Sequence, residues 1–376
     1  MIIQNALVFT EDFLFEKKNL YIRDRYIAEE AGADEEVVDA EGLYAIPGLI
    51  DIHLHGCAGF DFCDGTDAAL SAMAAYEAQN GITAFAPASM TLPEETLLQV
   101  FRTAVQYSRQ DRDGAMFCGI NMEGPFFSPE KKGAQNGAYL QKPDLALFHR
   151  LQNAADGRIK LVDIAPELEG ALPFIKAAAQ EVNVSVAHTA ADYQTARQAF
   201  AVGARHVTHL YNAMPPFSHR APGVVGAACD AGAAVELICD GVHVHESMIR
   251  ATWKLFGNDR VVLISDSMRA AGLQDGCYTL GGQEVTVRGS HATLSDGTIA
   301  GSVTNLFDCM RKAVSFGIPL ECAVRAATYN PACEIGEEAR MGTLSAGKLA
   351  NVVLLDRALN LRAVYIAGRQ VSLPPA

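Results

Sequence analysis

The sequence predicts an α/β protein, a (β/α)8 TIM-like barrel with a small β-sandwich domain that the N- and C-terminal segments form together. Three observations lead to this prediction. Short apolar runs alternate with helical patterns through the middle of the chain, and strand-like segments occur at both of its ends. Polar side chains with metal-binding capacity follow several of the apolar runs, at the place where a barrel carries its active site.

The two ends of the chain have the pattern of short antiparallel strands. Residues 1–45 alternate apolar and polar character around turn-like breaks, as in Asn19–Ile27 and Glu36–Asp39. Ala350–Asp356 and Leu361–Val371 are also strand-like and flank a turn. We therefore expect residues 1–45 and 345–376 to form one small β domain, with the barrel of residues 46–344 inserted between them.

The barrel prediction rests on apolar runs of a length that suits parallel strands buried on both faces. The runs are Gly48–His53, Ile82–Ala86, Met116–Met122, Ile159–Ile164, Val184–Ala187, His206–Leu210, Val235–Cys239 and Val261–Ser265. An open doubly wound sheet is the alternative. No G-x-G-x-x-G or P-loop pattern follows any run, which disfavours that alternative.

Helix signals separate the runs. Thr66–Asn80 has an acidic residue at its start and Gly81 after its end, and Pro93 opens the next helix before two acidic residues. Asp192–Val202 and Glu246–Phe256 are each followed by glycine. After the eighth run, we expect a β-hairpin over Tyr278–Thr293 around Gly281-Gly282 and helices over Thr304–Phe316 and Pro319–Ala327.

Composition excludes several classes of protein. The chain has 30 basic and 44 acidic residues, and its net charge of -14 argues against non-specific nucleic-acid binding. A small phosphorylated substrate remains compatible, because one or two local cations can hold it. The nine cysteines include no C-x-x-C pair, which favours a reducing compartment over a disulfide framework. We expect a cytoplasmic protein with no membrane segment, because neither a signal-peptide pattern nor an apolar run near 18 residues occurs.

Candidate metal ligands stand at the carboxyl ends of the runs. His53 and His55 form an H-x-H pair that strand periodicity places on one face. Glu123 follows the third run, and His188, His209 and Asp266 stand at the ends of the fifth, sixth and eighth runs. These ends converge in a barrel, and imidazole and carboxylate are ordinary ligands of zinc or iron. His206 competes with His209, but the offset of three residues places it on the opposite strand face.

This ligand set predicts hydrolytic chemistry. A divalent metal lowers the pKa of its bound water from ~15.7 to about 7, which provides a hydroxide nucleophile. Asp266 can accept the proton of that water as general base and return it to the leaving amine as general acid.

The motifs resemble those of a known family. Pro47–Gly56 is similar to the first-strand signature of the amidohydrolase superfamily. Further segments narrow the resemblance to the N-acetylglucosamine-6-phosphate deacetylase family; these are Met122–Phe126, Thr208–Met214, Arg220–Gly223, Cys239–His243 and Ile264–Met268. The resemblance implies hydrolysis of the N-acetyl group of N-acetyl-D-glucosamine 6-phosphate to D-glucosamine 6-phosphate and acetate.

The resemblance also implies roles for particular residues. Glu123, His188 and His209 would hold the principal metal, and Asp266 would be the acid–base group. Some family members lack the first-strand histidines and use one metal. Because His53 and His55 are both present here, we expect one or two metals per chain.

For the substrate, the resemblance implies contacts from several loops; the residues are Ala134, Gln135, Asn212, Ala213, Arg220, His243, Ile299, Ala300 and Gly301. Arg220 would bind the phosphate, in its own subunit or across a homodimer interface. Gln135 stands where some members have a histidine that polarises the acetyl carbonyl, so more polarisation would fall on the metal.

Three alternatives remain at this point. A sister enzyme would act on N-acetylgalactosamine 6-phosphate. Another amidohydrolase, such as a cyclic-amide hydrolase, would commonly carry a carboxylated lysine, but no lysine ends a predicted strand. A non-catalytic scaffold is disfavoured because every candidate ligand is present.

Overall fold

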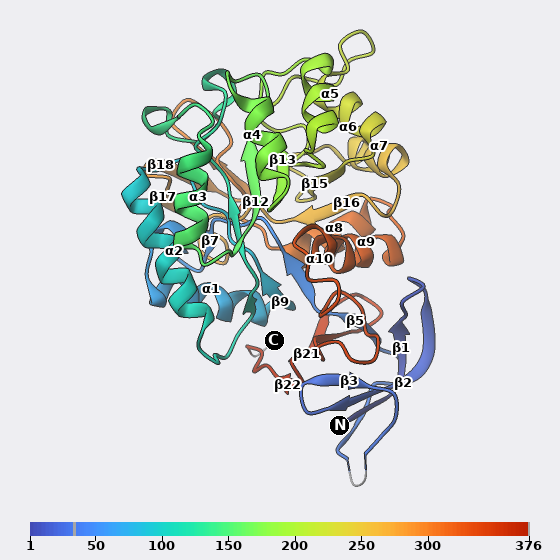
Figure 1. Ribbon diagram of the computed structural model, residues 1–376. Coiled ribbons are helices and arrows are strands. Elements are labelled where there is room, and N and C mark those ends of the chain that lie inside the picture. The colour runs from blue at the N-terminus through green and yellow to red at the C-terminus, as the bar shows by residue number, and fades with distance from the viewer. Residues whose placement is uncertain (33–34, 375–376) are drawn as a thin grey trace.

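The protein is a mixed α/β molecule in a computed structural model (Figure 1). The structure describes residues 1–32 and 35–374. Residues 33–34 and 375–376, which fall in the predicted terminal domain, lie outside the described residues. Within the described part of the chain, no helix is long and apolar enough to cross a membrane.

A parallel half-barrel forms the centre of the molecule. One parallel sheet has the order β11–β12–β13–β14–β15–β16, and a second has the order β10–β9–β6. The strands are β6 (Leu49–Asp51), β9 (Ile82–Phe85), β10 (Met116–Phe117), β11 (Ile120–Met122), β12 (Ile159–Ile164), β13 (Asn183–Val186), β14 (His206–Val207), β15 (Ala234–Ile238) and β16 (Val261–Ile264). Every apolar run of the prediction contains a strand, so the assignment of these segments is confirmed.

Contacts on both sides connect the two parallel sheets. A parallel bridge joins Ala88, beyond β9, to Asn121 in β11. On the other side, the main-chain N–H of Asp266, beyond β16, donates to the carbonyl of His53 at 2.9 Å. The ends of β6 and β16 therefore lie beside each other, although they are far apart in sequence.

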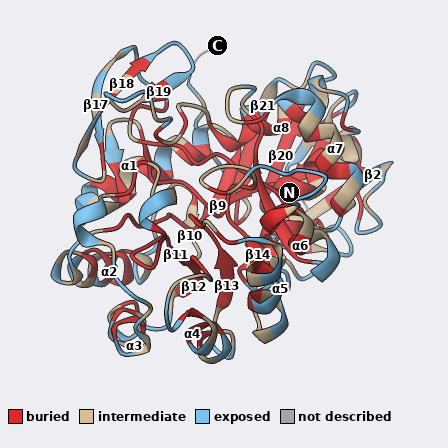
Figure 2. Cartoon of the chain, turned by 90° about the horizontal axis from the view of Figure 1, so that it is seen from above, coloured by how far each residue is buried: buried red, intermediate tan, exposed pale blue. Residues whose placement is uncertain are grey.

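Helices cover the outside of these strands (Figure 2), with buried inner faces and exposed outer ones. They are α1 (Asp67–Gln79), α2 (Glu94–Ser108), α3 (Leu145–Ala154), α4 (Ala171–Ala178), α5 (Tyr193–Val202), α6 (Gly223–Ala231), α7 (Glu246–Phe256), α8 (Leu306–Ser315), α9 (Leu320–Ala327) and α10 (Tyr329–Glu334). Thr66 and Asp192 cap α1 and α5 with their side chains, as their positions in sequence predict. The sequence did not predict α10, which accommodates Pro331 in its first turn.

The two ends of the chain meet in one sheet, where the blue and red segments of Figure 1 lie side by side. Its order is β22–β21–β20–β5–β1–β2–β3, with β4 paired to β1. The strands are β1 (Ile2–Phe9), β2 (Phe15–Arg23), β3 (Tyr26–Ala28), β4 (Val37–Asp39), β5 (Tyr44–Pro47), β20 (Val352–Leu355), β21 (Leu361–Ile366) and β22 (Arg369–Gln370). The pairing of the termini is confirmed by the antiparallel register of β20 and β5. A sandwich arrangement stays a prediction, as do the exact domain boundaries.

The hairpin expected after the eighth run is also present. It consists of β17 (Gly276–Leu280) and β18 (Gln283–Arg288), followed by β19 (His291–Thr293). Gly281 and Gly282 both have positive φ, which the two-residue turn between paired Leu280 and Gln283 requires. The Gln283 side chain donates to the carbonyl of Ala134, so the hairpin supports the loop that follows β11.

Candidate metal centre and substrate pocket

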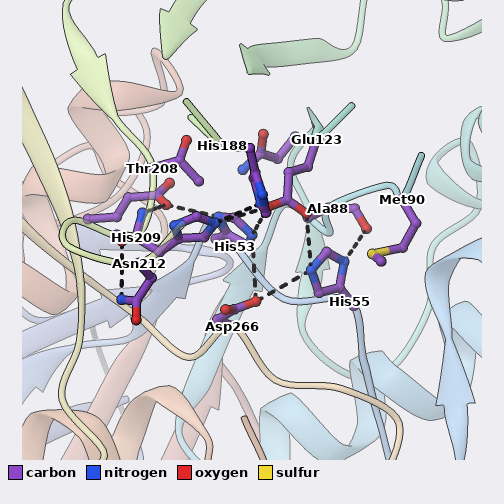
Figure 3. A network of polar contacts seen from close by, with 12 residues as sticks. His53, His55, Ala88, Met90, Glu123, His188, Thr208, His209, Asn212 and Asp266 are labelled. Carbon is purple, nitrogen blue, oxygen red and sulfur yellow. Dashed lines mark hydrogen bonds and ion pairs between the residues drawn. The ribbon is translucent and has the colours of Figure 1, made fainter. Parts of the chain in front are cut away.

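The predicted ligands converge at the carboxyl-end rim of the parallel strands (Figure 3). All of them are buried. His188, His209 and Asp266 each lie just beyond a strand and have φ of 42°, 28° and 49°. Such left-handed backbone is strained for residues other than glycine and is concentrated at functional sites. The side chains of all three residues lie at the centre of the rim (Figure 3).

The ligands form two groups, each with its donor atoms within 4.8 Å of one another. The Glu123 group consists of Glu123, His188 and His209. Glu123 Oε1 lies 3.1 Å from His188 Nε2 and 3.3 Å from His209 Nε2. The two imidazole nitrogens are themselves 3.1 Å apart.

The Asp266 group consists of His53, His55 and Asp266. Asp266 Oδ1 lies 3.7 Å from His53 Nε2 and 3.4 Å from His55 Nε2. Glu123 faces this group as well, because its Oε1 is 3.5 Å from His53 Nε2 and its Oε2 is 3.2 Å from His55 Nε2. Glu123 therefore stands between the two groups.

The hydrogen bonds on the outer side of the rings assign their tautomers. His55 Nδ1 contacts the Ala88 carbonyl at 3.2 Å, and His188 Nδ1 contacts the Lys131 carbonyl at 3.0 Å. A carbonyl only accepts, so both Nδ1 atoms carry hydrogen, and Nε2 is the nitrogen that can offer a lone pair to a cation at the centre. His53 Nδ1 lies 2.9 Å from a Glu236 carboxylate oxygen, with the same consequence.

A nitrogen lone pair and a carboxylate oxygen that face each other repel unless a positive charge lies between them. His53 Nε2 has no hydrogen-bond partner among the described residues, although two carboxylates are near it. Inward nitrogen lone pairs, carboxylate oxygens and outer hydrogen bonds to the rings are the arrangement by which proteins hold a divalent cation. The donor set therefore fits a metal.

The electrostatics of the cluster also favour positive charge at its centre. Burial alone would lower the pKa of His55, but the carboxylates of Glu123 and Asp266 raise it to about 10. Burial would raise the pKa of Glu123, yet His53 and His55 hold it well below its ordinary value.

A cavity of about 520 Å³ opens over the two groups. Most of the predicted substrate residues line it, namely Ala134, Gln135, Asn212, Ala213, His243, Ile299 and Gly301. Ala300 is fully buried and does not line the cavity. Arg220 is exposed on the segment before α6 and lies outside the cavity of its own chain. The substrate contacts themselves stay predictions.

The side-chain amide of Gln135 is bound to protein atoms at the edge of the cavity. Its side chain is 2% exposed. Its Oε1 accepts from the Thr91 main-chain N–H at 2.7 Å, and its Nε2 donates to Glu123 Oε2 at 2.8 Å. Both polar ends of the amide therefore bind protein atoms, and one of them fixes the carboxylate shared by the two ligand groups.

Sequence reasoning missed the acidic residues behind the rim. Glu236 in β15 and Asp163 in β12 are fully buried, and Asp163 lies with His53 and Glu123 in a further group of possible ligands. The signal was present, because Glu236 interrupts the otherwise apolar run Val235–Cys239, and Asp163 stands between Val162 and Ile164 in its run. His206 takes no place in the ligand groups; it contacts Glu236 and Glu334 instead.

Comparisons with known proteins identify the family of the chain. A sequence model of the amidohydrolase family matches residues 44–371. An N-acetylglucosamine-6-phosphate deacetylase of Bacillus subtilis is 38% identical, over 83% of this chain and 80% of the relative. An N-acetylgalactosamine-6-phosphate deacetylase of Escherichia coli is 33% identical, over 99% of both.

The chain is also similar in structure to solved deacetylases along almost its whole length. The N-acetylglucosamine-6-phosphate deacetylase of Pasteurella multocida superposes with a TM-score of 0.92 at 30% identity, covering 98% of both chains. A mutant of the Mycobacterium smegmatis enzyme, in complex with N-acetyl-D-glucosamine-6-phosphate, also has a TM-score of 0.92, at 33% identity over 99% of both chains.

Proposed function

This chain belongs to the amidohydrolase family, and we propose that it hydrolyses the N-acetyl group of N-acetyl-D-glucosamine 6-phosphate to D-glucosamine 6-phosphate and acetate. The observation that carries the proposal is the convergence of two buried ligand groups on one cavity. Relatives and solved structures similar to the chain along almost its whole length are named as deacetylases of N-acetylated amino-sugar phosphates.

We further propose that the parallel strands close into a (β/α)8 barrel. The bridge between Ala88 and Asn121 and the hydrogen bond between Asp266 and His53 support closure, because they connect the two parallel sheets on both sides. Closure explains why residues from the first and last parallel strands share the Asp266 group.

Two cations, zinc or iron, are proposed for the two groups, with Glu123 shared between them. When bound, a divalent cation polarises the acyl oxygen and lowers the pKa of a water molecule, so that water can attack the amide carbon at neutral pH.

Asp266 is proposed as the acid–base group. Burial would raise the pKa of this carboxyl, but His55 and His53 lower it below its ordinary value, which favours the ionised form. Its Oδ1 faces the two imidazoles, so we assign proton transfer to Oδ2. This oxygen would take a proton from the attacking water and pass it to the amine nitrogen as the carbon–nitrogen bond breaks.

For the phosphate we propose His243, with Asn212 and the main chain of Ala213 beside it on the cavity wall. Burial would lower the pKa of His243, but Asp240, 2.7 Å from its Nδ1, raises it and favours the imidazolium. Because Arg220 is exposed and outside the cavity of its own chain, we propose that it reaches the cavity of the partner in a homodimer.

One second candidate is supported by a specific observation. The Escherichia coli relative that spans 99% of this chain is named for N-acetylgalactosamine 6-phosphate. The two substrates differ in the configuration of one sugar hydroxyl, so a single loop side chain can decide between them.

The test is an assay of purified enzyme, reconstituted with zinc or iron, on both phosphorylated sugars and on unphosphorylated N-acetylglucosamine. We expect turnover of the phosphorylated glucosamine derivative above both others. Asp266→Asn should lower kcat about 10²- to 10⁴-fold, the range of general acid–base catalysis, with metal still bound. Robust hydrolysis of the unphosphorylated sugar alone, or near-normal turnover by Asp266→Asn, contradicts the proposal.

A further inference from the structure

Glu236 is a carboxylate in an unusual place. It stands in the middle of β15, between Val235 and Leu237, and its exposed fraction is 0%. Burying an ionised carboxylate is costly unless hydrogen bonds and opposite charge replace its water. The contacts of Glu236 therefore show which groups stabilise its charge and are held by it.

Glu236 Oε2 faces both ligand groups. It lies 2.9 Å from His53 Nδ1 and accepts the main-chain N–H of His209 at 3.1 Å. A single carboxylate oxygen thus holds the ring of one candidate ligand and the backbone of another.

Glu236 Oε1 faces away from the rim. It lies 3.2 Å from His206 Nε2, and His206 Nδ1 lies 2.8 Å from Glu334 Oε2 in α10. Asn183 also donates to Glu334 Oε2, at 2.7 Å. Because both oxygens are engaged, the carboxylate cannot turn away from His53 without losing a contact on its other side.

We propose that Glu236 is the positioning residue that allows the His53, His55 and Asp266 group to hold a cation. By accepting the Nδ1 hydrogen, it fixes the His53 ring with its Nε2 lone pair directed between Glu123 and Asp266. Without this acceptor, either ring nitrogen of His53 can carry the hydrogen, and a protonated Nε2 cannot bind a metal.

His53 differs in this respect from the two other rings with assigned tautomers. Main-chain carbonyls hold His55 and His188, and no side-chain substitution removes them. The inference rests on the proposed metal-dependent function. The experiment below measures metal content and not activity. Inactivity toward every sugar phosphate would therefore contradict the proposed function, and the metal measurement would still decide the role of Glu236.

The main experiment is a zinc titration of metal-free protein in competition with a chelator, with metal analysis of the loaded protein. We expect two zinc ions per wild-type chain. Glu236→Gln keeps an acceptor oxygen but loses the charge, and should weaken one of the two sites about 10-fold. Glu236→Ala loses both and should weaken that site about 100-fold, as changes behind a metal ligand commonly do.

Glu334→Gln is the matched control. It is an isosteric change in the same chain of polar contacts, separated from Glu236 by His206, and it keeps an acceptor for His206. Both zinc sites should keep their wild-type affinity in this variant. Circular dichroism and thermal unfolding establish that each variant is folded, and Glu236→Gln carries the test if Glu236→Ala is unfolded.

A double mutant shows which site is affected. His55→Asn removes a ligand of the Asp266 group, and the remaining ion should then be insensitive to Glu236→Gln within about twofold. One zinc ion per wild-type chain at saturation, unchanged affinities in both Glu236 variants, or an equal loss at the remaining site in the His55→Asn background would each overturn the proposal.

Discussion

The two ligand groups share Glu123 but depend on different parts of the molecule. In the Glu123 group, the loop after β11 supplies the outer contacts of two side chains, since the Lys131 carbonyl holds His188 and Gln135 holds Glu123, while Glu236 accepts the main-chain N–H of His209. In the Asp266 group, the contacts come from the strands and their immediate ends: Glu236 of β15 holds His53, and the Ala88 carbonyl holds His55.

Because of this difference, substitutions near the two groups should have different effects on metal binding and substrate binding. The loop that supports the Glu123 group also lines the cavity, through Lys131, Ala134 and Gln135. Changes there should affect metal and substrate together. The Asp266 group is supported from within the parallel strands, where Glu236 is fully buried, so changes there should affect metal binding with little direct effect on the cavity wall.

The largest expected effect compares one ligand from each group. His188→Asn should lower kcat/KM about 10³-fold or more, because a principal cation contributes several kcal/mol to the transition state. His55→Asn should lower it about 10- to 100-fold, since the Glu123 group and the acid–base group Asp266 remain. Steady-state kinetics with metal analysis measures both, and a greater loss in His55→Asn would reverse the ranking of the groups.

A smaller effect on zinc binding and kcat is expected from substitution of Gln135 in the loop after β11. Gln135→Ala leaves the Thr91 N–H and Glu123 Oε2 without their partner, and should weaken zinc binding about 10- to 100-fold with a lower kcat. Gln141→Ala, an exposed glutamine further along the same loop, is the control and should be indistinguishable from wild type. Wild-type zinc affinity in Gln135→Ala would show that Glu123 does not need this support.

The smallest effect is expected from His243, which belongs to neither ligand group. His243→Gln removes the imidazolium beside the cavity and should raise KM for the phosphorylated substrate about tenfold, with kcat and metal content unchanged. Because Asp240 raises the pKa of His243 above 6.5, its charge is complete below pH 6.5 and is lost as pH rises through the raised pKa.

Accordingly, KM of the wild type should rise with pH across that window, after correction for ionisation of the phosphate itself, and KM of His243→Gln should not. The unphosphorylated sugar supplies the control, because its KM should respond neither to the substitution nor to this titration. A parallel pH dependence in both proteins would remove His243 from phosphate binding.

Much of the site was predictable because of one rule of architecture. The carboxyl ends of parallel strands meet on one face, so His53, Glu123, His209 and Asp266 could be expected to converge from their positions after apolar runs. Glu236 was missed because its run was treated as uniformly apolar. Its acidic side chain inside a strand was a readable signal of a buried polar contact.

By itself, the sequence determined which segments become strands and which residues end them, because hydrophobic periodicity and turn chemistry are local properties. It also suggested that the two ends of the chain pair, which the register of β20 and β5 confirmed. Only the tertiary structure decided that Gln135 binds Glu123, and that Glu236 holds a histidine 183 residues away. Hydrogen bonds of this kind depend on the direction and burial of side chains from distant segments, and no periodicity within one segment encodes them.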